Sequence, residues 1–181
     1  MRQMIIRQTK DDDLNYILFV EREAFKSNKE ANLVKHMLSD PSANPLLSLI
    51  ATIGNRAIGH ILFTTAHLSN NPNKVKISLL VPLAIIPNYQ KQGIGSKLVK
   101  RGLELLSKSG VDLVFVLGHP KYYPKYGFTP ASKLGFEAPY PIPEEVADAW
   151  MVQALHPNVI GTISGKVICC NALNKPEHWR E

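Results

Sequence analysis

A long apolar run that ends in a glycine-containing turn most constrains how this chain folds. Residues 77–86 are almost entirely apolar, which is typical of a strand buried on both faces of a sheet. Pro87 ends the run, and residues 90–95 (Gln-Lys-Gln-Gly-Ile-Gly) lead into a helical periodicity that begins at about Ile94. Glycines permit backbone conformations that side chains disfavour, and the free N–H groups of a first helical turn attract anions. The sequence therefore predicts a strand-turn-helix unit that holds a phosphate-bearing ligand.

Three phosphate-binding motifs share this outline, and their spacings separate them. The Walker pattern Gly-x-x-x-x-Gly-Lys-Ser/Thr is absent from the sequence. A dinucleotide-binding fingerprint needs a third glycine where this chain has Leu98, and an acidic residue about 20 positions further on. Asp112 comes nearest, but it precedes a different predicted strand. Gln90 to Gly95 instead satisfy Gln/Arg-x-x-Gly-x-Gly/Ala, and with this motif the chain resembles the GNAT superfamily of acetyl-CoA-dependent N-acetyltransferases.

A second motif follows the next predicted strand, residues 113–117. Residues 118–128 read Gly-His-Pro-Lys-Tyr-Tyr-Pro-Lys-Tyr-Gly-Phe, and in the GNAT pattern this strand leads into a short helix with Tyr-x-x-x-Gly-Phe. Tyr123 falls on the tyrosine position of that pattern, ahead of Gly127. The order and distance of the two motifs strengthen the resemblance, which extends from Ile5 to about residue 128.

The resemblance implies an α/β fold (α+β in some schemes) with a mixed central sheet, a splayed parallel strand pair and helices on both faces. Local patterns predict strands at 4–8, 47–53, 57–66, 77–86, 113–117 and 165–169, and helices from about Leu14, at 30–38 and from Ile94 to Gly110. Gly54-Asn55 predicts a tight hairpin. We expect residues 1–181 to form a single domain, with residues from about 129 as its C-terminal elaboration.

Pro82 interrupts the central strand, and a proline there usually marks a bulge or an unpaired position. In the GNAT fold this strand bulges away from its parallel neighbour, and the resemblance places the pantetheine arm of acetyl-CoA in the opening. It implies that the backbone of Leu83, Ala84 and Ile85 pairs with the arm, as an added strand pairs with a sheet edge. The implied pyrophosphate-binding residues are Gln90, Lys91, Gln92, Gly93, Ile94, Gly95 and Ser96.

Acetyl transfer to a primary amine needs a neutral nucleophile, a polarised thioester carbonyl and a proton for the departing thiolate. A thiol has an unperturbed pKa of about 8.5 and tyrosine one of about 10, so a tyrosine near the sulfur can donate. Tyr123 is therefore the predicted catalytic residue; alternatively it packs in an aromatic cluster with Tyr122 and Tyr126. Cys169 and Cys170 lie far along the chain from both motifs, which favours direct transfer over a covalent intermediate.

The general base stays open, because the sequence has no acidic residue between Asp40 and Glu104. Many GNAT members place a glutamate on the central strand, and this chain departs from that pattern. His119, Glu21, Glu23 and a chain of water molecules are the alternatives. The acceptor amine and the tolerance for acyl groups longer than acetyl also stay open. A non-catalytic acyl-CoA-binding sensor or regulatory module is the alternative function.

The net charge of +6 comes from residues 41–103, which hold seven basic and no acidic side chains. Four of these, Lys91, Lys97, Lys100 and Arg101, flank or follow the glycine turn. They could face coenzyme A phosphates or form an ordinary solvated helix face. A nucleic-acid surface would interleave aromatic residues, so we expect no nucleic-acid partner.

The remaining expectations concern location and partners. No apolar run approaches the ~20 residues of a membrane span, and no signal-peptide core precedes Lys10, so we expect a cytoplasmic protein without membrane contact. The two cysteines are adjacent and form no zinc pattern, so no metal cofactor is expected. Many GNAT relatives pair their C-terminal strands, which makes a homodimer possible.

Overall fold

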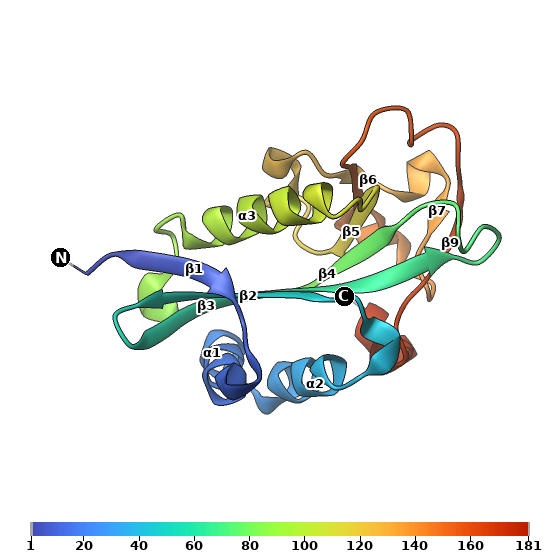
Figure 1. Ribbon diagram of the computed structural model, residues 1–181. Helices are drawn as coiled ribbons and strands as arrows, with labels where there is room; N and C mark the ends of the chain where they lie inside the picture. The colour runs from blue at the N-terminus through green and yellow to red at the C-terminus, as the bar shows by residue number, and fades with distance from the viewer. Residues whose placement is uncertain (1, 181) are drawn as a thin grey trace.

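A mixed β-sheet with helices on both faces organises the chain (Figure 1). The computed structural model describes residues 2–180, and within them the strand order is β1-β2-β3-β4-β5-β8-β6, with β9 beside β3 and β7 beside β9. Along the main path, β4 and β5 are parallel and the other neighbours are antiparallel. The strands are β1 (Met4–Gln8), β2 (Leu47–Ile53), β3 (Arg56–Leu68), β4 (Ile77–Ile85), β5 (Leu113–Leu117), β6 (Thr129–Pro130), β7 (Phe136–Glu137), β8 (Trp150–Ala154) and β9 (Gly165–Ile168).

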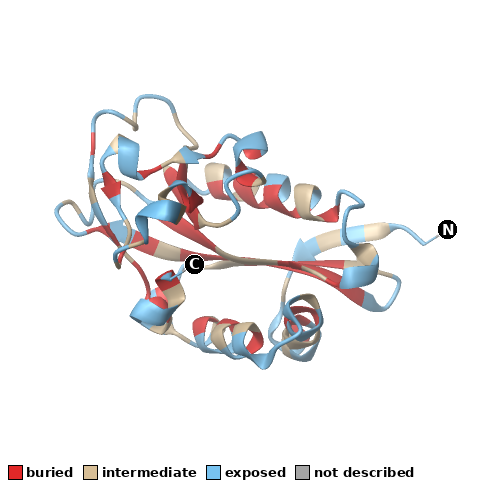
Figure 2. Cartoon of the chain, turned by 180° about the vertical axis from the view of Figure 1, so that it is seen from behind, coloured by how far each residue is buried: buried red, intermediate tan, exposed pale blue. Residues whose placement is uncertain are grey.

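Three α-helices cover the sheet. Helix α3 (Ile94–Lys108) lies on one face, and α1 (Leu14–Phe25) and α2 (Asn28–Leu38) lie on the other (Figure 1). Buried residues concentrate in the sheet and on the inward sides of these helices (Figure 2). Helix α3 can approach β3 closely because Gly102 has no side chain. A Cβ at this position would lie 2.4 Å from the Phe63 ring. Within residues 2–180, no helix is long and apolar enough to span a membrane.

The predicted GNAT-type architecture is confirmed, and the differences from the sequence prediction are local. Helix α2 begins at Asn28 instead of residue 30, because the Ser27 hydroxyl accepts a hydrogen bond from the Lys29 N–H and caps the helix. The final strand ends at Ile168. Strand β8, which the sequence did not predict, pairs with β5.

The parallel strands β4 and β5 separate part-way along their length. Their pairing covers Ile77–Leu80 of β4 and Leu113–Val116 of β5. Beyond it, β5 continues alongside β8, where Leu117 pairs with Trp150. The predicted splay is therefore present, and within residues 2–180 the later part of β4 has no strand partner on the β5 side.

A bulge in β4 coincides with the point of separation. On the β3 side, Leu80 pairs with Phe63 and Leu83 with Ile61, so Val81 and Pro82 together oppose a single β3 residue. Two residues against one is the definition of a bulge, which bends the strand and increases its twist. The bulge that the sequence predicted at Pro82 is therefore confirmed.

An ion pair between the exposed Arg7 and the buried Asp13 ties β1 to the start of α1. The Asp13 carboxylate accepts hydrogen bonds from Arg7 Nη1 at 2.7 Å and Nη2 at 2.9 Å, and from the Lys10 N–H at 2.7 Å. Asp13 is 4% exposed. The Arg7 guanidinium, acting against the desolvation of the carboxylate, lowers the pKa of Asp13 to about 2.

This ion pair predicts a specific loss of stability in acid. An unfolded aspartate has a pKa of about 3.9, so the Asp13 contribution is complete above pH ~4 and disappears as the pH falls towards 2. Asp13→Asn should lower the free energy of unfolding at pH 7 by about 1–2 kcal/mol and reduce its change between pH 4 and 2. Urea denaturation across this pH range measures both effects. Asp12→Asn, at an exposed neighbouring position, is the control, and equal losses in the two variants would contradict the assignment.

Candidate functional site

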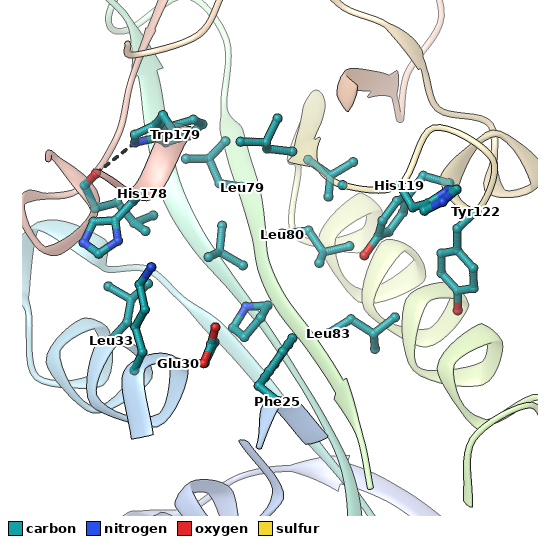
Figure 3. A pocket seen from close by; sticks show the side chains of 18 of the residues that line it. Phe25, Glu30, Leu33, Leu79, Leu80, Leu83, His119, Tyr122, His178 and Trp179 are labelled. Carbon is teal, nitrogen blue, oxygen red and sulfur yellow. Dashed lines mark hydrogen bonds between the residues drawn. The ribbon is translucent and has the colours of Figure 1, made fainter. Parts of the chain in front are cut away.

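Two cavities meet where β4 and β5 separate. The first, of about 480 Å³, lies at the N-terminus of α3 and is called the turn cavity below. The second, of about 410 Å³, lies between the splayed strands, α2 and the C-terminal segment, and is called the splay cavity (Figure 3). Leu83 and Tyr122 line both of them.

The turn cavity depends on two glycines that act in different ways. Gly93 caps α3 in the left-handed region with φ of +83°, where a side chain would be strained. Gly95 is needed for space, because a Cβ there would lie 2.7 Å from the Tyr122 hydroxyl oxygen and 3.5 Å from the Leu83 side chain. The N–H groups of Ile94, Gly95 and Ser96 have no acceptor within the helix. Backbone donors and the positive end of the helix dipole therefore face this cavity.

Most of the predicted cofactor-binding residues come together here. The turn cavity is lined by Leu83, Ile85, Gln90, Lys91, Gly93, Ile94, Gly95 and Ser96. Ala84 and Gln92 do not line it: Ala84 is buried, and the Gln92 amide donates to the Asn88 carbonyl at 3.0 Å. The Gln90 amide donates to the Ile85 carbonyl at 2.9 Å, which ties the turn to the end of β4.

The structure adds aromatic and cationic groups that sequence reasoning missed. Tyr89, Tyr122, Lys125 and Tyr126 also line the turn cavity. The Tyr126 hydroxyl donates to the Tyr122 hydroxyl at 2.9 Å, and the Lys125 ammonium lies 4.1 Å from the centre of the Tyr122 ring. The tyrosine-rich run signalled these residues, but we had interpreted Tyr122 and Tyr126 as packing groups alone.

Only one of the four positive charges near the glycine turn in the sequence lies at the turn cavity. Lys91 lines the turn cavity, whereas Lys97, Lys100 and Arg101 do not. Arg101 instead pairs with Glu104 at 3.0 Å on the exposed side of α3. The cations at the turn cavity are thus Lys91 and Lys125.

Tyr123 is buried at the start of the short 3-10 helix Tyr123–Tyr126 and lines the splay cavity. Its ring packs edge-on against Phe128, with centroids 5.7 Å apart, and Gly118 leaves room for it because a Cβ there would lie 2.4 Å away. Within residues 2–180, its hydroxyl makes no hydrogen bond. Burial raises the pKa of Tyr123 well above its ordinary value, so the hydroxyl is protonated at neutral pH.

The splay cavity has mainly apolar walls. Tyr122 and the exposed His119 lie across it from Glu30 and Leu33 (Figure 3). Its C-terminal wall, Pro176–Trp179, is held in place because Trp179 Nε1 donates to the Leu173 carbonyl at 2.9 Å. The polar side chains in the lining are Lys29, Glu30, His119, Tyr122, Tyr123, Glu177 and His178.

The candidate bases occupy three different environments. His119 lines the splay cavity, and its Nδ1 accepts a hydrogen bond from the Lys121 N–H at 3.1 Å. Glu21 is fully buried; its Oε2 is hydrogen-bonded to His60 Nδ1 at 2.8 Å, and His60 Nε2 to Ser48 Oγ at 2.8 Å. Glu23 is exposed and lines a separate surface pocket with Arg56. Of these three residues, His119 alone lines the splay cavity.

The comparisons with known proteins agree with this geometry. Residues 5–131 match the family described as acetyltransferase (GNAT) domain. The chain belongs to the GNAT acetyltransferase family. Within residues 2–180, no grouping of three His, Cys, Asp or Glu residues could hold a metal ion.

Several relatives of this GNAT chain match it over nearly its full length. It is 44% identical over 164 residues to the uncharacterized N-acetyltransferase YjhQ of Escherichia coli, covering 90% of each chain. The structure of the N-acetyltransferase YhbS of Escherichia coli in complex with CoA superposes with a TM-score of 0.87 at 26% identity, covering 97% of this chain and 94% of that one. A GNAT acetyltransferase of Brucella melitensis shares the fold, with a TM-score of 0.76 at 24% identity over 96% of this chain and 99% of that one.

Proposed function

We propose that this protein transfers an acetyl group from acetyl-CoA directly to a primary amine acceptor. The observation that carries the proposal is the junction of two cavities at the end of the β4–β5 pairing, with Tyr123 in the wall of one and the α3 N-terminus in the wall of the other. One cavity suits the cofactor phosphates and the other suits the acceptor. The CoA complex of the relative YhbS supports acetyl-CoA as the donor.

The turn cavity fits the pyrophosphate of coenzyme A. Its backbone N–H groups and helix dipole favour an anion, and Lys91 and Lys125 add positive charge. The proposed pyrophosphate-binding residues are those of the run 90–96 that line the cavity, Gln90, Lys91, Gly93, Ile94, Gly95 and Ser96. The Tyr122 hydroxyl occupies the space that Gly95 leaves, whereas nothing lies within 4 Å of where a Cβ at Gly93 would be, so the backbone at Gly93 is open to a ligand.

The pantetheine arm fits the opening between β4 and β5. The backbone of Leu83, Ala84 and Ile85 lies beyond the last β4–β5 pair and can accept an added strand-like partner. The Ile85 carbonyl already accepts the Gln90 amide, and its second lone pair stays available. A backbone N–H at this edge would also polarise the thioester carbonyl.

Tyr123 is the proposed general acid for the departing thiolate. Burial raises its pKa, so donation to a thiol of ordinary pKa would be more unfavourable than the sequence suggested. The same desolvation raises the pKa of a sulfur held in the cavity, which brings donor and acceptor closer together. Burial has this effect on Cys169 of this protein, whose pKa it raises to about 12.

Direct transfer is favoured because neither cysteine lies at the cavities. Cys169 and Cys170 are both buried and line neither the turn cavity nor the splay cavity. Their raised pKa values keep the thiols protonated and unreactive. The amine would therefore attack the thioester carbonyl itself.

Gly95→Val tests the cofactor site. The new side chain would clash with the Tyr122 hydroxyl and fill the turn cavity, so acetyl-CoA should no longer raise the melting temperature. A ligand at 100 times its dissociation constant stabilises the folded state by roughly 2.7 kcal/mol, which thermal denaturation detects readily. Ser107→Val, at the far end of α3, controls for the helix propensity of valine. A full acetyl-CoA shift in Gly95→Val would contradict the proposed site.

Tyr123→Phe tests the chemistry. The change keeps the ring and its packing against Phe128 but removes the hydroxyl, so acetyl-CoA affinity should be retained while kcat falls by about 10²- to 10⁴-fold. The assay is thiol release from acetyl-CoA with a panel of primary amines. Tyr16→Phe, at an exposed position of α1, should behave as wild type. Unchanged kcat in Tyr123→Phe would assign thiolate protonation to solvent, and acetyl-CoA binding without turnover of any amine would favour the sensor function.

A further inference from the structure

Glu30 is a carboxylate in the splay cavity that has no partner in the fold. It lies in the first turn of α2, between Leu33 and Phe25 in the ring of lining side chains (Figure 3). Its Oε2 is inaccessible to water and has no hydrogen bond from any group in residues 2–180. A carboxylate oxygen that is buried without a hydrogen bond costs free energy, and a cationic donor in the cavity, reached by rotation of the Glu30 side chain, would recover that cost.

The neighbouring charges leave Glu30 available to such a donor. Lys29 and Glu177 are exposed side chains of the same cavity, so water screens them. The lining also contains two histidines, His119 and His178. Glu21 also lies near Glu30: its Oε2 is bonded to His60, and its Oε1 is, like Glu30 Oε2, buried without a hydrogen bond from any group in residues 2–180. Within residues 2–180, Glu30 forms no ion pair.

The side chains around Glu30 indicate the chemical character of the part of the ligand that does not contact the carboxylate. Apolar side chains come from α1, α2, both splayed strands and the C-terminal segment: Phe25, Leu33, Leu83, Leu117, Leu173 and Trp179. A cavity of about 410 Å³ is near the lower end of the range of roughly 300–1,000 Å³ for small-molecule sites. Of the two carboxylates in the lining, Glu177 is exposed and Glu30 lies among these apolar walls, so the site suits a single cation carried on a small apolar body.

We propose that Glu30 binds the ammonium group of the acceptor, and that the acceptor is a small primary amine with an alkyl or aralkyl body. This inference rests on the proposed acetyl transfer and adds the substrate class. Polyamines, amino acids and folded proteins suit the site less well, because they would bring additional charges or bulk into apolar walls.

The proton balance gives Glu30 a defined part in the reaction. The acceptor enters as an ammonium ion, and one proton passes from its nitrogen to Glu30 and on to solvent. The neutral nitrogen forms the C–N bond at the thioester carbonyl carbon, and the C–S bond breaks as Tyr123 protonates the sulfur. The nitrogen loses its second proton to solvent during this collapse, and Tyr123 regains a proton from solvent.

The test compares Glu30→Gln with wild type on a charged probe and its uncharged isostere. Protein loaded with CoA is titrated with 2-phenylethylamine or 2-phenylethanol, and acetyl transfer to the amine is measured with acetyl-CoA. Glu30→Gln should weaken amine binding, and raise the amine KM, by roughly 10- to 100-fold, the effect expected for a charged hydrogen bond. Binding of the alcohol and the acetyl-CoA thermal shift should not change. Glu177→Gln removes a carboxylate at an exposed position of the same cavity. It should alter amine binding less than roughly threefold, because an exposed ion pair is screened by water and contributes little free energy.

Each other outcome overturns a specific statement. Equal weakening of amine and alcohol would make Glu30 a packing residue, and unchanged amine binding would remove it from the acceptor site. Wild-type protein that acetylates polyamines or peptides but binds no 2-phenylethylamine would overturn the substrate class and leave acetyl transfer standing. Absence of any acetyl-CoA thermal shift would overturn the proposed function itself, and this inference with it.

Discussion

The function proposed for this protein depends on the early end of the pairing between β4 and β5. After Leu80 and Val116 the two strands diverge, because the bulge at Val81 and Pro82 bends β4 while β5 continues beside β8. A continuous sheet would bury these backbone groups in ladder hydrogen bonds. The divergence instead leaves polar backbone available to a ligand and opens a cavity into which Tyr123 and Glu30 both project from separate elements.

Close packing of small residues positions the groups around this opening. Gly95 and Gly118 provide space for Tyr122 and Tyr123, respectively. The two aromatic rings pack edge-on, 5.0 Å apart, so the wall shared by the two cavities is held by neighbours in the same short segment. In the proposed reaction, one segment, residues 118–127, would contribute both to cofactor binding and to protonation of the thiolate.

Strong local signals allowed much of this to be predicted from the sequence. The apolar run of β4, the Gly54-Asn55 hairpin, the start of α3 and the bulge at Pro82 all depend on residues close together in the chain. The splay of β4 from β5 was implied by the family resemblance. Strand β8 was missed because Trp150–Ala154 lacks clear alternation and is a strand only through its pairing with β5. The availability of Glu30 and the unavailability of Glu21 were equally hidden, because they depend on which helical carboxylate meets His60 on β3. The sequence left Arg101 open between a phosphate contact and a solvated helix face, and its pairing with Glu104 on the same helix agrees with the second alternative.

The structure of this protein in complex with CoA is the measurement that tests the central claim most directly. The pantetheine arm should lie between β4 and β5, with its amides hydrogen-bonded to the backbone of residues 83–85 and its sulfur within hydrogen-bonding reach of the Tyr123 hydroxyl. A coenzyme whose arm lies outside this opening, or whose sulfur faces a different proton donor, would contradict the claim that the splayed strands form the catalytic site.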